Sequence, residues 1–191
     1  MSEHSSSILL WLSALGDLFS IAAFLLGLFA LRQWRTIKKA DAAEASLALL
    51  DQLDGAFKFV RSQMYLPREF GLPSEERRRR ISDVLVQRWS DRKSTTTNEA
   101  FRVGRLCEMR LGPDGPKAYE LFQRLRRHCD EADNAAFALG LSGALMTEES
   151  LWSIAVRDEA NDPLQVRFDQ DAQELKRLLE RYLPTLKRRR V

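Results

Sequence analysis

Apolar residues recur along most of the chain at alternating steps of three and four, which is the spacing of one face of an α-helix. The segment from Ile8 to Leu31 differs, because it is apolar on all sides and Asp17 is its only charged residue. Helical spacing continues beyond it, and no proline occurs before Pro67. The pattern predicts one long helix that runs from the apolar segment into a soluble body, with Gly55 as its weakest point. Its inward positions in the body are Ala43, Leu50, Leu53, Phe57, Val60 and Met64.

The remaining apolar stripes predict further helices, separated by segments rich in proline, glycine or polar residues. No run alternates in the manner of a β-strand, so we expect an all-α body, a bundle of about five helices that includes the end of the first. The separating segments are YLPREFGLP (65–73), SDRKSTTTNE (90–99), LGPDGP (111–116), GLSG (140–143) and NDP (161–163). We expect a shorter helix that begins at Thr147 and runs through Trp152. The inward positions of the other helices are Ile81, Val84, Leu85, Trp89, Ala100, Val103, Cys107, Leu111, Ala118, Phe122, Leu125, Cys129, Ala132, Ala136, Leu139, Leu164, Phe168, Leu175, Leu179 and Tyr182.

The apolar segment is long enough to cross a membrane. Its 24 residues would span roughly 36 Å as a helix, against a hydrocarbon core of about 30 Å. The preceding MSEHSSS carries no lysine or arginine, and the apolar run is long for the core of a signal peptide. We therefore expect a retained anchor, with a short N-terminus at 1–7, a transmembrane helix at 8–31, a helical domain at 32–186 and a basic tail at 187–191.

Basic residues at both ends of the body set its expected orientation. The group after the apolar segment places the helical domain in the cytoplasm and the N-terminus outside a bacterial inner membrane, by the positive-inside rule. Anionic lipid attracts each such residue by about 1 kcal/mol, although a topology signal alone also explains the group. The tail is a solvated charged end or a contact for membrane, acidic partners or nucleic acid. The first group is Arg32, Arg35, Lys38 and Lys39, and the tail holds Lys187, Arg188, Arg189 and Arg190.

Small side chains form one stripe along the apolar segment, at alternating steps of three and four. Such residues let membrane helices approach closely and recover van der Waals contact, so the stripe predicts association with a second copy or with another membrane subunit. The repeat of 3.5 favours left-handed packing. The alternative is that the stripe has no role in association, because small residues are common in any membrane helix. The stripe consists of Ser13, Gly16, Ser20, Ala23, Gly27 and Ala30.

Asp17 lies next to this stripe, about 100° round the helix from Gly16. An ionised side chain in hydrocarbon costs several kcal/mol unless it finds water or a partner. In an oligomer Asp17 would face a neighbour or an enclosed aqueous space, and as a single helix it would hydrate through a local defect of the bilayer. We expect the first arrangement, because stripe and carboxylate coincide.

Candidate catalytic residues are few. His4 lies in the short N-terminus, which leaves His128 as the one imidazole with a helical neighbourhood; with Arg124 it could bind a phosphodiester and transfer a proton, as a metal-independent ribonuclease requires. The alternative is a partly exposed histidine beside core Cys129, and we favour it. The chain contains no nucleotide-binding, zinc-protease or hydrolase motif. We predict no metal, no cofactor and two buried free thiols, Cys107 and Cys129.

A single N-terminal span, the basic segment RQWRTIKK (32–39) and an all-α body together resemble small bacterial single-pass membrane proteins. Among these, the chain looks distantly like the membrane-anchored, HEPN-like accessory proteins of type VI-B CRISPR systems. That resemblance implies assembly into rings and a pore used in antiviral defence. HEPN ribonucleases carry Arg-x4-His, whereas the residue five before His128 is Gln123, and Arg124 stands only four before it. This departure argues against ribonuclease activity.

Three hypotheses follow. The first is a non-enzymatic inner-membrane protein that forms a homo-oligomer, and in its strongest form a gated pore. The second is a membrane-tethered RNA-binding protein or ribonuclease that uses Arg124 and His128. The third is a single-span accessory subunit of a larger membrane complex, which would co-purify with other subunits without associating with itself.

Overall fold

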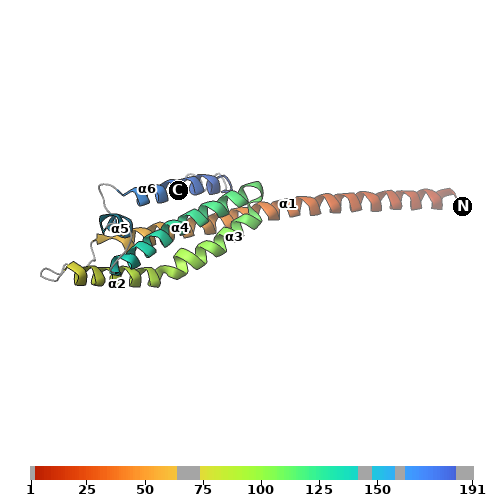
Figure 1. Ribbon diagram of the computed structural model, residues 1–191. Helices are drawn as coiled ribbons and strands as arrows, with labels where there is room; N and C mark the ends of the chain where they lie inside the picture. The colour runs from red at the N-terminus through yellow and green to blue at the C-terminus, as the bar shows by residue number, and fades with distance from the viewer. Residues whose placement is uncertain (1–2, 64–73, 142–147, 158–161, 184–191) are drawn as a thin grey trace. The chain divides into compact units, whose positions relative to one another are not determined.

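The computed structural model describes residues 3–63, 74–141, 148–157 and 162–183. The chain is all-helical over these residues, as the sequence predicts, and it divides into two compact units, Met1–Lys39 and Ala40–Val191. The first unit is part of a single helix, α1 (Glu3–Arg61), which continues into the second (Figure 1). The predicted long N-terminal helix is therefore confirmed, and it passes through Gly55 without a break.

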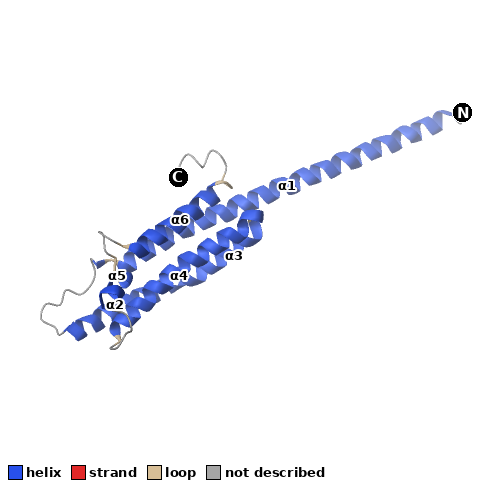
Figure 2. Ribbon diagram, turned by 45° about the horizontal axis from the view of Figure 1, so that its top comes forward, coloured by secondary structure: helices blue, strands red, loops and turns tan. Residues whose placement is uncertain are grey.

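The second unit is a helical bundle, which we call the body. Its other helices are α2 (Ser74–Lys93), α3 (Ala100–Arg110), α4 (Gly115–Gly140), the short α5 (Glu148–Ala155) and α6 (Pro163–Glu180). α4 packs against α2, α3, α5 and α6, which makes it the central helix of the body (Figure 2). The predicted inward positions of α3 and α4 are all buried.

The polar segment SDRKSTTTNE is not a break between two helices, and this expectation was wrong. α2 leads directly into a π-helix (Ser94–Glu99) and then into α3, so the chain stays helical from Ser74 to Arg110. The stretch contains no proline or glycine that would stop a helix. Thr96 is buried, and its hydroxyl donates to the Arg92 carbonyl at 3.1 Å, which removes the cost of a buried polar group.

The turn between α3 and α4 depends on its glycines. A 3-10 helix (Gly112–Asp114) connects the two, and Gly112 has a φ of 62°, a conformation that other residues rarely adopt. Gly115 begins α4, where an added Cβ would collide with the carbonyl oxygens of Cys107 and Glu108. The predicted turn LGPDGP is thus confirmed, and it folds α4 closely back against α3.

Aromatic stacking and charged pairs hold the remaining helices. Phe57 of α1 stacks on Phe168 of α6 with ring centroids 4.3 Å apart, and it meets Trp89 of α2 edge-on at 6.3 Å. Four ion pairs or hydrogen bonds between described residues join α4 and α6, and they follow the two helices in opposite chain directions, so these helices are antiparallel. The pairs are Lys117–Glu174 at 2.6 Å, Arg124–Asp171 at 3.5 Å, His128–Asp171 at 2.9 Å and Glu131–Arg167 at 2.9 Å.

Candidate functional site

The predicted association stripe lies on the apolar part of α1. Ser20, Ala23, Gly27 and Ala30 are exposed, as is Gly16. A Cβ added at Gly16 or Gly27 would meet no atom within 4 Å, so both glycines leave their side of the helix open to a neighbour. The side chains of Ser13 and Asp17 lie outside the described residues.

The large apolar residues of this segment are also exposed, on every side of the helix. Leu25 is 58% exposed and Phe29 63%, and Leu18, Phe19, Ile21, Phe24, Leu26, Leu28 and Leu31 are exposed too. Among the described residues, α1 is the one helix that is long and apolar enough to cross a membrane, by length and composition. Ser20 donates its hydroxyl to the Gly16 carbonyl at 2.9 Å, so this polar group is satisfied inside the helix.

The basic group that follows is accessible. Arg32 and Arg35 are exposed, and Lys38 and Lys39 are partly exposed. The Lys38 ammonium lies 6.0 Å from the centre of the Trp34 ring, a cation–π distance. An exposed tryptophan among basic residues is typical of the interface between lipid and water.

His128 and Arg124, the candidate catalytic pair, are both bound to α6 through Asp171. His128 Nε2 lies 2.9 Å from Asp171 Oδ2, and Arg124 lies 3.5 Å from Asp171 Oδ1 and 2.7 Å from Glu120. The hydrogen bond to Glu120 is the main cause of a raised Arg124 pKa. The other nitrogen of His128, Nδ1, is buried and has no hydrogen-bond partner. Neither imidazole nitrogen is thus open to a substrate, and the geometry is that of a link between α4 and α6.

Sequence reasoning missed Asp171, although a signal was present. Phe168 and Leu175 are inward positions of α6, and residue 171 falls between them at steps of three and four. A carboxylate at an inward position of a helix needs a partner from another helix. In the described structure, His128 of α4 is this partner of Asp171.

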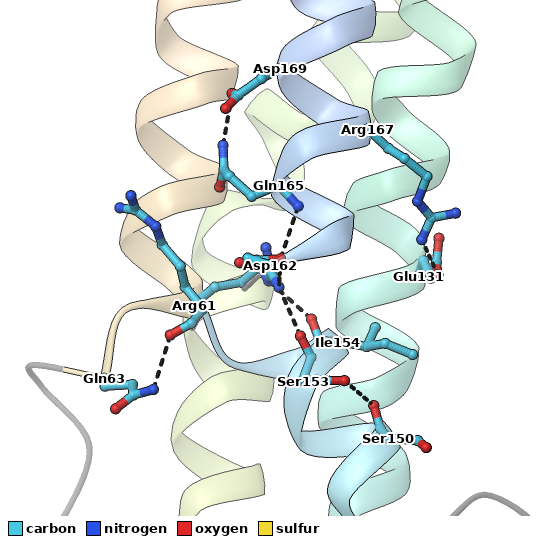
Figure 3. A network of polar contacts seen from close by, with 11 residues as sticks. Arg61, Gln63, Glu131, Ser150, Ser153, Ile154, Asp162, Gln165, Arg167 and Asp169 are labelled. Atoms are coloured by element: carbon cyan, nitrogen blue, oxygen red, sulfur yellow. Dashed lines mark hydrogen bonds and ion pairs between the residues drawn. The ribbon is translucent and has the colours of Figure 1, made fainter. Parts of the chain in front are cut away.

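Among the described residues, the most buried charged pair joins Arg61, at the end of α1, to Asp162, which caps α6 (Figure 3). The Arg61 side chain is fully buried; its Nη2 donates to Asp162 Oδ1 at 3.0 Å and to the Ser153 carbonyl at 3.2 Å. Its Nε donates to the Ile154 carbonyl at 2.9 Å. Asp162 Oδ1 also accepts the Gln165 N–H, so one arginine closes the end of α5 and pairs with the cap of α6. Burial lowers the Arg61 pKa, and the contact with Asp162 opposes this shift.

The two cysteines are free and buried, as predicted. Cys107 Sγ lies 2.8 Å from Ser46 Oγ, and burial raises the pKa of both thiols, so they remain protonated at neutral pH. No three His, Cys, Asp or Glu side chains lie close enough to hold a metal ion in the part of the chain that the structure describes.

A scan against protein-family models found no match for this chain, and searches of curated proteins and of solved structures found none either.

Proposed function

We propose that this chain is a non-enzymatic, membrane-anchored helical protein that assembles with copies of itself through the apolar part of α1. Its N-terminus would lie outside the bacterial inner membrane and its body in the cytoplasm. The observation that carries the proposal is the all-round exposure of the apolar side chains from Leu18 to Leu31. Apolar surface of this extent is unfavourable in water and is typical of a segment surrounded by lipid.

Two features of α1 support association within the lipid. The Ser20 hydroxyl bonds to its own helix, so a lipid environment leaves no orphaned donor there. The open sides of Gly16 and Gly27 allow a second helix to approach closely, which is the main source of attraction between helices in a bilayer.

Asp17 adds an energetic reason for assembly. A carboxylate inside a membrane helix costs about 2.5–3.5 kcal/mol on insertion scales, and such residues face other protein or water rather than lipid. In an assembly built on the stripe, Asp17 would lie at or near the contact. An ion-conducting pore, which the resemblance to CRISPR accessory proteins implies, is one form that this assembly would take.

The sharpest test compares two neighbouring alanines. Ala23 belongs to the stripe, whereas Ala22 lies about 100° round the helix and outside it. Ala23→Ile should reduce the mass of the particle extracted gently from native membranes, because the larger side chain separates the backbones. Ala22→Ile makes the same chemical change on another face and should leave the mass unchanged.

Two further variants extend the test. The double variant Gly16→Ile and Gly27→Ile should disperse the oligomer, and Asp17→Leu should abolish ion leak from vesicles that contain the protein. An unchanged particle mass in both variants would contradict the proposal. Co-purification of other membrane subunits without self-association would instead identify an accessory subunit.

The geometry of His128 does not support a ribonuclease. One of its nitrogens is bonded to Asp171 and the other is buried, so a substrate would have to displace an interhelical contact. RNA cleavage that disappears in His128→Ala, but persists in Asp171→Asn, would overturn this conclusion.

A further inference from the structure

The part of α1 that belongs to the body has one uncovered side. Six of its seven exposed positions are spaced four, three, four, three and four, so they form one helical face; the seventh, Asp51, lies at the edge of that face. Three of the six are alanine or glycine, which leaves room for a second backbone. We call this side the open face of α1; it consists of Asp41, Ala45, Ala48, Gln52, Gly55 and Phe59.

A cavity of about 370 Å³ lies on the open face. α1 contributes Gln52, Gly55, Ala56 and Phe59 to its lining, which are the positions i, i+3, i+4 and i+7 that form a hole for one side chain of a facing helix. A Cβ at Gly55 would meet no atom within 4 Å, so the hole is open above it. Arg92 and Thr95, from α2 and the π-helix, line the cavity from the second helix.

One exposed charge, Arg92, lines this cavity, and an opposite exposed charge, Asp51, is the sequence neighbour of the lining residue Gln52. The Arg92 guanidinium lies 5.4 Å from the centre of the Phe59 ring, and no carboxylate within the described ranges pairs with it. Its neighbour Arg88 is used differently, because it donates to the Val60 and Ser62 carbonyls at 3.2 and 3.1 Å. Asp51 precedes Gln52, is exposed, and likewise forms no ion pair with any described residue.

We infer that the open face binds a second copy of this chain, with Asp51 of one copy entering the cavity of the next and pairing with Arg92. The inference rests on the proposed function, because copies anchored in the membrane with the same orientation run parallel. Each residue then lies at the same distance from the membrane in every copy. Asp51 lies one, four and five residues before Gln52, Gly55 and Ala56 of the cavity lining. This separation is at most about 8 Å along the helix axis, which the side chains of aspartate and arginine span together. Each copy carries both Asp51 and a cavity lined by Arg92, so each copy can bind one neighbour on either side and the contact can repeat around a closed ring.

The open face repeats with the same seven-residue spacing as the small-residue stripe of the apolar segment, so one contact could continue along both. Asp41, Ala48 and Gly55 follow one another at seven-residue steps, and Gly55 stands four such steps after Gly27. Seven-residue spacing is the repeat that parallel helices share when they supercoil.

Charge reversal in the full chain, extracted in mild detergent, tests the pairing. Asp51→Arg and Arg92→Asp should each lower the fraction of oligomer seen by native mass spectrometry, because each places like charges at the contact. The double reversal restores opposite charges and should recover the oligomer. Lys93→Asp, an exposed neighbour outside the cavity lining, makes the same charge change as Arg92→Asp and should leave the oligomer intact. All four variants should keep the thermal melting of the parent chain, since the substituted side chains are exposed.

The outcomes separate this contact from the membrane anchor. If Ala23→Ile disperses the oligomer while both single reversals leave it intact, self-assembly stands and the Asp51–Arg92 contact is wrong. Failure of the double reversal to recover the oligomer would also overturn the pairing, and would indicate another occupant of the cavity. If Ala23→Ile leaves the oligomer intact but the single reversals disperse it, the contact stands and the anchor does not drive assembly.

Discussion

Residues 18–31 and residues 42–60 belong to the same helix, yet their apolar side chains have opposite surroundings. In the first segment Leu25 and Phe29 are more than half exposed, and large apolar residues point to every side. In the second segment Leu53, Phe57 and Val60 are fully buried, and polar or small residues occupy the exposed side together with one large apolar residue, Phe59. The second pattern is that of a helix packed in a protein core, whereas the first is that of a helix long and apolar enough to cross a membrane, by length and composition.

The two segments also treat their polar residues differently. Ser20 in the first segment bonds only to its own backbone, whereas Ser46 in the second bonds to its own helix and to Cys107 of α3. Arg61, at the end of the second segment, reaches two other helices. The body thus uses polar groups to fix its helices against each other, while the apolar side chains of residues 18–31 stay exposed.

The largest expected effect comes from charge in the apolar segment. Phe19→Lys together with Ile21→Lys should make insertion less favourable by about 5–7 kcal/mol, because each lysine near the middle of a membrane helix costs about 2.5–3.5 kcal/mol. Fractionation should then move the protein from the membrane pellet to the soluble or degraded fraction. Gln170→Lys, a lysine on the exposed side of α6, serves as the control and should leave the protein in the pellet.

The second effect concerns the body alone. Arg61→Leu leaves Asp162 buried without its partner, and such a loss typically destabilises a protein by about 3–5 kcal/mol. Denaturant unfolding in detergent should show this loss for the body, with membrane fractionation unchanged. Adding Asp162→Asn should recover part of it, because the buried charge is then removed. If Arg61→Leu removed as much protein from the membrane pellet as the double lysine variant does, the anchor and the body would not behave as separate parts.

The spacing of apolar residues was sufficient to predict most helices of the body. A helix that buries one face has an apolar residue every three or four positions, and this pattern is visible in the sequence. Seven of the nine buried residues of α4 from Ala118 to Leu139 are those that the spacing indicated, and the other two are Leu121 and Ala135. The polar segment at 90–99 misled the prediction, since hydroxyl residues favour turns in isolation but here bond within a continuous helix. Local propensity could not show that Thr96 would be buried against other helices.

The polar links were less predictable than the core. The sequence pattern placed Asp162 only in the separating segment NDP (161–163) and indicated no role for Arg61, because their contact joins residues 101 positions apart. Asp171 likewise acquires its meaning from His128 on another helix. The predicted association stripe and basic group lie on α1 and stay predictions, because a helix can display a contact surface without revealing what covers it.

The smallest effect tests a polar link at the other end of the body, between α6 and the α3–α4 turn. The Tyr182 hydroxyl lies 2.9 Å from the Leu111 carbonyl and 2.9 Å from Asp114, and burial, followed by these contacts with Asp114, raises its pKa to about 12. Tyr182→Phe should cost about 1 kcal/mol at neutral pH, the usual net value of a hydrogen bond. Because the folded pKa lies above the unfolded value of about 10, the contribution of Tyr182 is complete below pH 10 and is lost as the pH rises toward 12. The difference in unfolding free energy between parent and variant should therefore shrink over that interval, and a difference that stays constant would show that the hydroxyl does not hold α6 to the turn.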